Sequence, residues 1–74
     1  MDASKYLIIF ERGLNNYSAY SPDLPGCVAT GKTRDLVERR MREAIEMHIA
    51  GLREDGLPIP QPQSEAGWVS VAVA

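Results

Sequence analysis

The sequence contains one cysteine and one histidine, and none of its apolar runs is long. One thiol cannot form a disulfide within the chain, and secreted domains of this size usually depend on several. The lone Cys27 therefore favours a reducing compartment, the cytoplasm. A membrane-spanning helix needs about 20 consecutive apolar residues, so we expect no membrane association.

The sequence also lacks a marked excess of charge of either sign. Eight basic and ten acidic residues give a formal net charge of −2, and Glu65 is the only charged residue between positions 56 and 74. Binding to a phosphate backbone requires a concentrated positive field. We therefore expect no direct binding of this chain to DNA or RNA.

Hydrophobic patterning predicts a single α+β domain over residues 1–74, with elements in the order β-β-β-α-β. Three strands are expected at 5–11, 17–21 and 27–31, followed by a helix and a last strand at 68–73. Thr33 is a good N-cap for the helix, and Gly56 is placed to end it as a C′ glycine. The predicted sheet has three antiparallel strands and a fourth strand parallel to the first, reached by a crossover.

The first predicted strand is apolar on both faces. Tyr6, Ile8 and Phe10 alternate with Leu7 and Ile9. One helix covers one face of a sheet, so the other face needs a partner surface. This predicts self-association as a dimer or a tetramer.

Few residues here are suited to catalysis. The predicted first strand has no acidic residue at its centre and the last has none at all, whereas a two-metal nuclease needs several converging carboxylates. Glu43 and Glu46 are predicted to lie on the solvated helix face. His48 falls within the apolar helical stripe, and Cys27 is expected to be a small buried residue. We therefore expect no enzymatic activity, metal or cofactor.

The segment Pro22-Asp23-Leu24-Pro25-Gly26 is the most specific local feature. Its two prolines fix an irregular corner between two strands, and Pro25-Gly26 suits the central positions of a type II turn. The corner is either a rigid reversal of the chain or a shaped loop at a protein interface, and the two interpretations are compatible.

The run from residue 17 to 62 closely resembles the HicB family of antitoxins. It contains PDLPGC at 22–27, Thr30-Gly31, the predicted cap Thr33, REAIE at 42–46 followed by His48, and DGLPIP at 55–60. The resemblance implies a partial ribonuclease H-like fold without catalytic acids. It also implies a partner, a HicA toxin that cleaves mRNA. Many members carry a C-terminal DNA-binding domain, and we expect this chain to be the short form of the family without one.

Two functions remain open at this point. The first is a protein that binds and neutralises a HicA-type toxin. The second is a stand-alone homo-oligomeric module with a regulatory or ligand-binding role. Because an RNA-binding toxin is basic, we expect its inhibitor to present acidic and apolar groups, and we predict the partner contacts Glu11, Asp23 and Leu24. Pro22, Pro25, Gly26, Thr33 and Gly56 are predicted to shape the fold.

Overall fold

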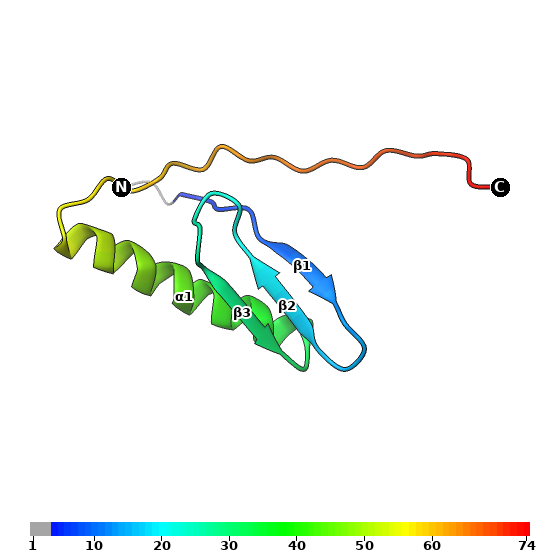
Figure 1. The fold of residues 1–74 in the computed structure, drawn as a ribbon, viewed down its shortest axis with the longest axis horizontal. Helices are drawn as coiled ribbons and strands as arrows, with labels where there is room; N and C mark the ends of the chain where they lie inside the picture. The colour runs from blue at the N-terminus through cyan, green and yellow to red at the C-terminus, as the bar shows by residue number, and fades with distance from the viewer. Residues whose placement is uncertain (1–3) are drawn as a thin grey trace.

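The computed structural model describes residues 4–74, and it has three antiparallel strands followed by one helix (Figure 1). The strands are β1 (Ile9–Arg12), β2 (Tyr17–Tyr20) and β3 (Val28–Gly31), and the helix is α1 (Arg34–Glu54). The sheet order is β1-β2-β3, with Phe10 opposite Ala19 and Ala19 opposite Ala29. This confirms the α+β class and the three-stranded antiparallel sheet.

The helix begins and ends where its capping residues predict. The Thr33 hydroxyl accepts a hydrogen bond from the Leu36 N–H at 3.1 Å, which satisfies one of the free donors of the first turn. At the other end, the Gly56 N–H donates to the Arg53 carbonyl and the Leu57 N–H to the Leu52 carbonyl. These two bonds form a Schellman motif, and the positive φ of Gly56, 66°, allows it.

The proline corner at 21–27 consists of two consecutive β-turns. The Leu24 N–H donates to the Ser21 carbonyl, and the Cys27 N–H donates to the Leu24 carbonyl. Each turn has a proline at its second position, and Gly26 has a φ of 91° at the third position of the second turn. The predicted type II turn at Pro25-Gly26 is thus confirmed.

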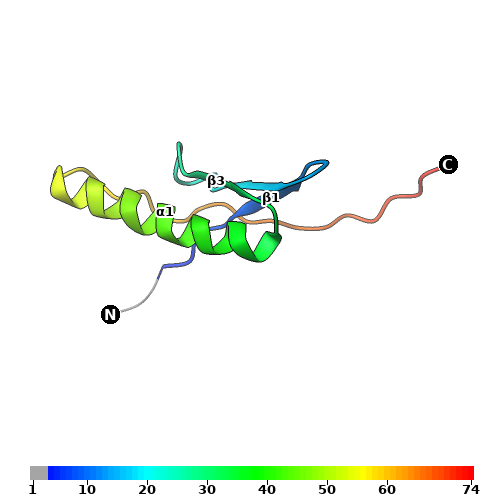
Figure 2. The same ribbon diagram turned by 90° about the horizontal axis from the view of Figure 1, so that it is seen from below.

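The core lies between the sheet and α1, on one face of the sheet (Figure 2). Its buried residues come from β2, the corner and two successive turns of the helix: Ala19, Leu24, Cys27, Val37 and Met41. Tyr6, Ile8 and Phe10 pack against them from the chain before and within β1. The alternation predicted for this segment therefore places its aromatic face on the core.

The predicted fourth strand at 68–73 is not part of the sheet in this chain. Residues 57–74 contain no helix or strand, and they extend along one side of the molecule and beyond it (Figure 1). A strand needs a neighbouring strand to satisfy its backbone groups, and β2 alone pairs with β1. The predicted parallel strand is therefore absent from the sheet in this conformation.

Candidate protein interaction surfaces

Asp23, predicted to contact a partner, holds the chain after the helix against the proline corner. Its carboxylate accepts hydrogen bonds from the backbone N–H groups of Gln63 and Ser64, both at 3.1 Å, and from the Ser64 hydroxyl at 2.9 Å. These bonds stabilise the ionised carboxylate, the Ser64 N–H most of all, and they lower the pKa of Asp23 from its ordinary value of 3.8. Asp23 therefore works as an internal anchor.

The other two predicted contacts have opposite exposures. Leu24 is completely buried, so its side chain has no surface to offer a partner in this conformation. It packs with Val37 and Met41 because the two flanking turns direct it into the core. Glu11, in contrast, is exposed near the end of β1. Of the three predicted residues, Glu11 alone presents a free acidic surface.

A second anchor for the segment after the helix comes from Tyr6, which the sequence did not single out. Its hydroxyl donates to the Pro60 carbonyl at 2.7 Å. Together with the Asp23 bonds, it fixes residues 60–64 beside the corner and the chain before β1. The interactions span 40 to 54 positions along the chain, and no local pattern indicates them.

The outer face of the sheet, opposite α1, carries an apolar row across all three strands. It consists of Ile9, Tyr20 and Val28, which the strand register aligns. Tyr20 is 40% and Val28 is 64% exposed. In Figure 2 the helix covers the other face only. The row confirms that the sheet keeps an uncovered apolar face, as the sequence of the first strand predicts.

A groove of about 910 Å³ separates the chain before β1, α1 and the segment after the helix. Apolar side chains line it along its length, namely Tyr6, Ile8, Ile45, Ile49 and Ile59. Charged side chains of both signs also line it, among them Lys5, Glu38, Arg42 and Arg53. A concave surface with apolar side chains and a few polar groups is the usual composition of a ligand site.

The residues with possible chemistry lie apart from these surfaces. Cys27 is buried, its thiol is 3.9 Å from the Ala44 carbonyl, and burial raises the pKa of the thiol. His48 and Cys27 both line a shallow hollow of about 220 Å³. Within residues 4–74, no group of three or more acidic, histidine or cysteine side chains is placed to hold a metal, and no helix is long and apolar enough to cross a membrane.

This geometry defines a small α+β domain whose exposed features are apolar surfaces suited to protein contacts. The chain belongs to the HicB-like antitoxin family: the model of the family described as HicB-like antitoxin of bacterial toxin-antitoxin system matches residues 6–71. The match includes all three strands, the helix and the segment after the helix to within three residues of its end.

Curated relatives support this assignment. A UPF0150 protein of Helicobacter pylori is 39% identical over 49 residues, which cover 66% of this chain and 68% of that protein. The UPF0150 protein Ta0767 of Thermoplasma acidophilum is 32% identical over 62 residues, 82% of this chain and 90% of that protein. An uncharacterised protein of Haemophilus phage HP1 is 36% identical over 56 residues, and the match covers 42% of its length.

A solved structure has the same fold. One chain of a HicA3 and HicB3 toxin-antitoxin complex superposes with a TM-score of 0.68 and 30% sequence identity. The similarity covers 81% of this chain and 70% of that one. The three antiparallel strands followed by one helix are thus the architecture of a protein from a toxin-antitoxin pair.

Proposed function

We propose that this protein is an antitoxin that binds and neutralises a HicA-type toxin, an mRNA ribonuclease. The observation that carries the proposal is the similarity over most of the chain to a component of a HicA3 and HicB3 complex. Membership of the HicB-like antitoxin family supports the same role. The chain itself carries out no reaction in this proposal; it acts by covering the toxin.

We place the toxin contact on the outer face of the sheet, around the apolar row and Glu11. Tyr20 and Val28 offer exposed apolar area, and Glu11 lies on the same face because it alternates with Phe10, which packs on the core. An acidic group beside apolar side chains complements a basic RNA-binding protein. Asp23 and Leu24 contribute by fixing the corner that connects β2 to β3.

Co-expression with the neighbouring reading frame tests the proposal directly. A HicA-type product should co-purify with this chain, and the complex should lose the ribonuclease activity of the free toxin. If the two proteins do not associate at any ratio, the antitoxin role is wrong for this pair.

Charge reversal then tests the contact surface. Glu11→Lys and Glu43→Lys each reverse one exposed charge, the first on β1 and the second on the helix. We expect Glu11→Lys to weaken toxin binding by about tenfold, mainly through a slower association, and the difference from the unmodified chain should shrink as the salt concentration rises. Glu43→Lys should leave binding unchanged. If calorimetry gives equal losses of toxin binding for the two variants, the toxin contact does not lie on the outer face of the sheet.

A stand-alone homo-oligomeric module is the second candidate. The groove beside α1 favours it, because a partly apolar groove of this size can receive a ligand without any toxin. A defined oligomer that never associates with the neighbouring gene product would support this candidate over the antitoxin role.

A further inference from the structure

The last part of the chain projects from the molecule with its apolar side chains in solvent. We call residues 65–74 the arm. Trp68 is fully exposed, and Val69, Val71 and Val73 are 85%, 72% and 86% exposed. The longest dimension of the molecule, 52 Å, lies along this direction (Figure 1). Surface this apolar is rarely left in water by a folded protein.

The arm has the sequence of a strand and lacks a partner in its own chain. Its valines recur at every second position, and β-branched residues at that spacing are typical of strands. Within residues 4–74, no hydrogen bond joins the arm to any other segment. Its backbone donors and acceptors are therefore free for a second strand.

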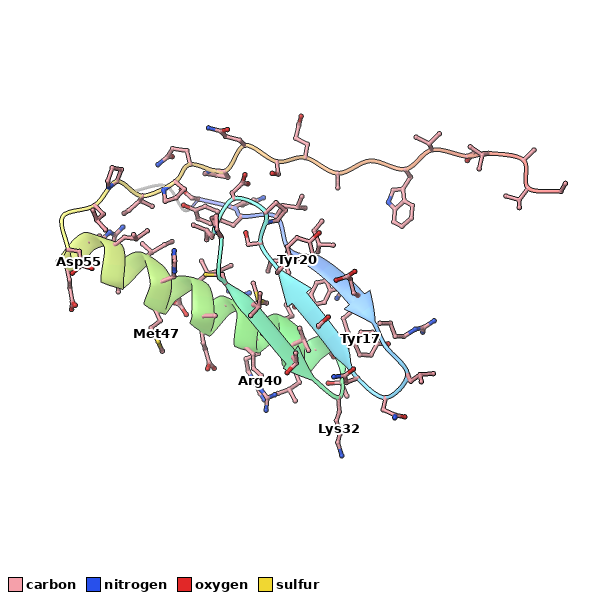
Figure 3. The ribbon with its side chains drawn as sticks, viewed as in Figure 1. Tyr17, Tyr20, Lys32, Arg40, Met47 and Asp55 are labelled. Atoms are coloured by element: carbon pink, nitrogen blue, oxygen red, sulfur yellow. The ribbon has the colours of Figure 1, made fainter. Side chains whose placement is uncertain are left out.

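Of the two sheet edges, β1 presents the free one. The sheet order leaves β1 and β3 as edge strands. At the β3 edge, an Arg40 guanidinium N–H donates to the Thr30 carbonyl at 2.7 Å, and Figure 3 shows Arg40 on the helix beside β3. A side chain bound to an edge carbonyl blocks the approach of another strand. No such bond covers β1 within the part of the chain described.

The anchors at residues 60–64 determine where the arm leaves the body. Asp23 holds Ser64 and Tyr6 holds Pro60, so the arm starts beside the chain that leads into β1. From there it runs outward, away from β1 of its own chain (Figure 1). A fixed base and an extended arm are geometry suited to reaching a neighbouring molecule.

We propose that the arm of one copy pairs as a fourth strand with the free edge of β1 in a second copy, and that the second arm pairs in return. The same chain carries both the donor strand and the receiving edge, so a two-fold dimer satisfies two arms and two edges at once. Glu65 at its base is the only charged side chain of the arm, and residues 66–74, which include the predicted strand, have none. The strand itself therefore lacks the acidic groups that would select a basic toxin and the basic groups that would select a nucleic acid. This inference stands independently of the toxin contact.

The molecular mass and the tryptophan fluorescence of the full chain test whether two copies pair through their arms. Light scattering should give twice the chain mass at roughly tens of micromolar and the mass of one chain on dilution, as for a dissociation constant in the micromolar range. Trp68 is the only tryptophan. Its emission should shift to shorter wavelength as the dimer forms, and this shift should follow the mass. A blue-shifted emission at the mass of one chain would mean that the arm folds onto its own β1, and would overturn the proposal.

Proline substitutions test the strand pairing itself. Alternate N–H groups of a strand face its partner, so Ser70→Pro and Val71→Pro are both needed to remove a ladder bond with certainty. At least one should raise the dimer dissociation constant by about tenfold or more. Ala66→Pro, also in the arm but outside the paired segment, should keep the dimer. At a concentration low enough for single copies, circular dichroism should be the same in all three variants and in the unmodified chain.

Two results would overturn the proposal. The first is the mass of one chain for the unmodified protein over the whole concentration range. The second is a dimer that both Ser70→Pro and Val71→Pro leave intact, since the copies would then meet through another surface such as the outer face of the sheet.

Discussion

Valine has opposite surroundings in the body of the molecule, residues 4–56, and in the arm. Val37 on the first half of α1 is completely buried, whereas Val69, Val71 and Val73 are each more than two-thirds exposed. The side chains are identical, so hydrophobicity alone does not decide burial. Val37 faces a sheet that its own chain supplies, and the arm valines have no such surface within residues 4–74.

The comparison separates two questions about an apolar strand pattern: whether the segment must be covered, and which chain covers it. Alternating apolar residues indicate that a segment gains free energy by being covered. They do not indicate which chain supplies the cover. In the body the same chain supplies the cover, so the stability of a single copy should depend on residues 4–56 and be nearly independent of the arm.

The largest expected effect is in the core, where two methionines of the same helix form a matched pair. Met41 is completely buried and Met47 is 75% exposed; Figure 3 shows Met47 projecting from α1. Met41→Ala should lower the free energy of unfolding by about 2–5 kcal/mol, which is a large part of the total for a small domain. Met47→Ala should change it by less than about 0.5 kcal/mol. Urea unfolding measures both, and similar losses would show that the helix faces are misassigned.

A smaller effect is expected at the start of α1, the junction between sheet and helix. Thr33→Ala removes the oxygen that accepts from the Leu36 N–H and should cost about 1 kcal/mol. Thr33→Ser keeps that oxygen and should cost much less. Thermal unfolding of the two variants separates loss of the cap from loss of the methyl group, and equal losses would argue against capping as the cause.

Local rules predicted most of the body correctly. The helix ends at Thr33 and Gly56 and the turn at Pro25-Gly26 depend on residues within one or two turns of each other. The alternation before and within β1 correctly predicts which side chains pack on the core. The first strand is shorter than the predicted 5–11, since β1 comprises Ile9–Arg12 and residues 5–8 have no partner in the sheet.

The features that local patterns did not reveal depend on contacts between distant positions. Leu24, predicted to offer an apolar group to a partner, is buried in the core; it is the one large apolar residue of the corner, and that signal could have indicated burial. The carboxylate of Asp23 binds residues about 40 positions away. The sequence pattern predicts a last strand beside β1 of the same chain, but it contains no information on which copy of β1 that strand pairs with.

The boundary between body and arm should be sensitive to acid. Because the pKa of Asp23 is lowered in the folded chain, its hydrogen bonds to Gln63 and Ser64 are complete above the ordinary value of 3.8 and are lost as the pH falls below it. The amide chemical shifts of Gln63 and Ser64 in NMR should follow this titration. In Asp23→Asn the same amides should show no acid-dependent change between about pH 5 and 2, while Glu11→Gln should leave the titration intact. A titration that persists in Asp23→Asn would assign it to another group.

The smallest effect is expected for Trp68→Ala, and this variant is the most direct test of the difference between body and arm. Trp68 and Phe10 are both large aromatic residues, but Phe10 packs against the core and lies 4.1 Å below the Arg34 guanidinium, while Trp68 is fully exposed. At a concentration low enough for single copies, Phe10→Ala should destabilise the chain by about 3 kcal/mol, and Trp68→Ala should change the free energy of unfolding by less than about 0.5 kcal/mol. Urea unfolding followed by circular dichroism gives both values without relying on tryptophan emission.

A loss of more than about 1 kcal/mol in Trp68→Ala under these conditions would mean that the indole packs on its own chain in solution, since the removal of a fully exposed side chain breaks no contact. The arm valines would then also pack against their own chain, and their surroundings would no longer differ from those of Val37.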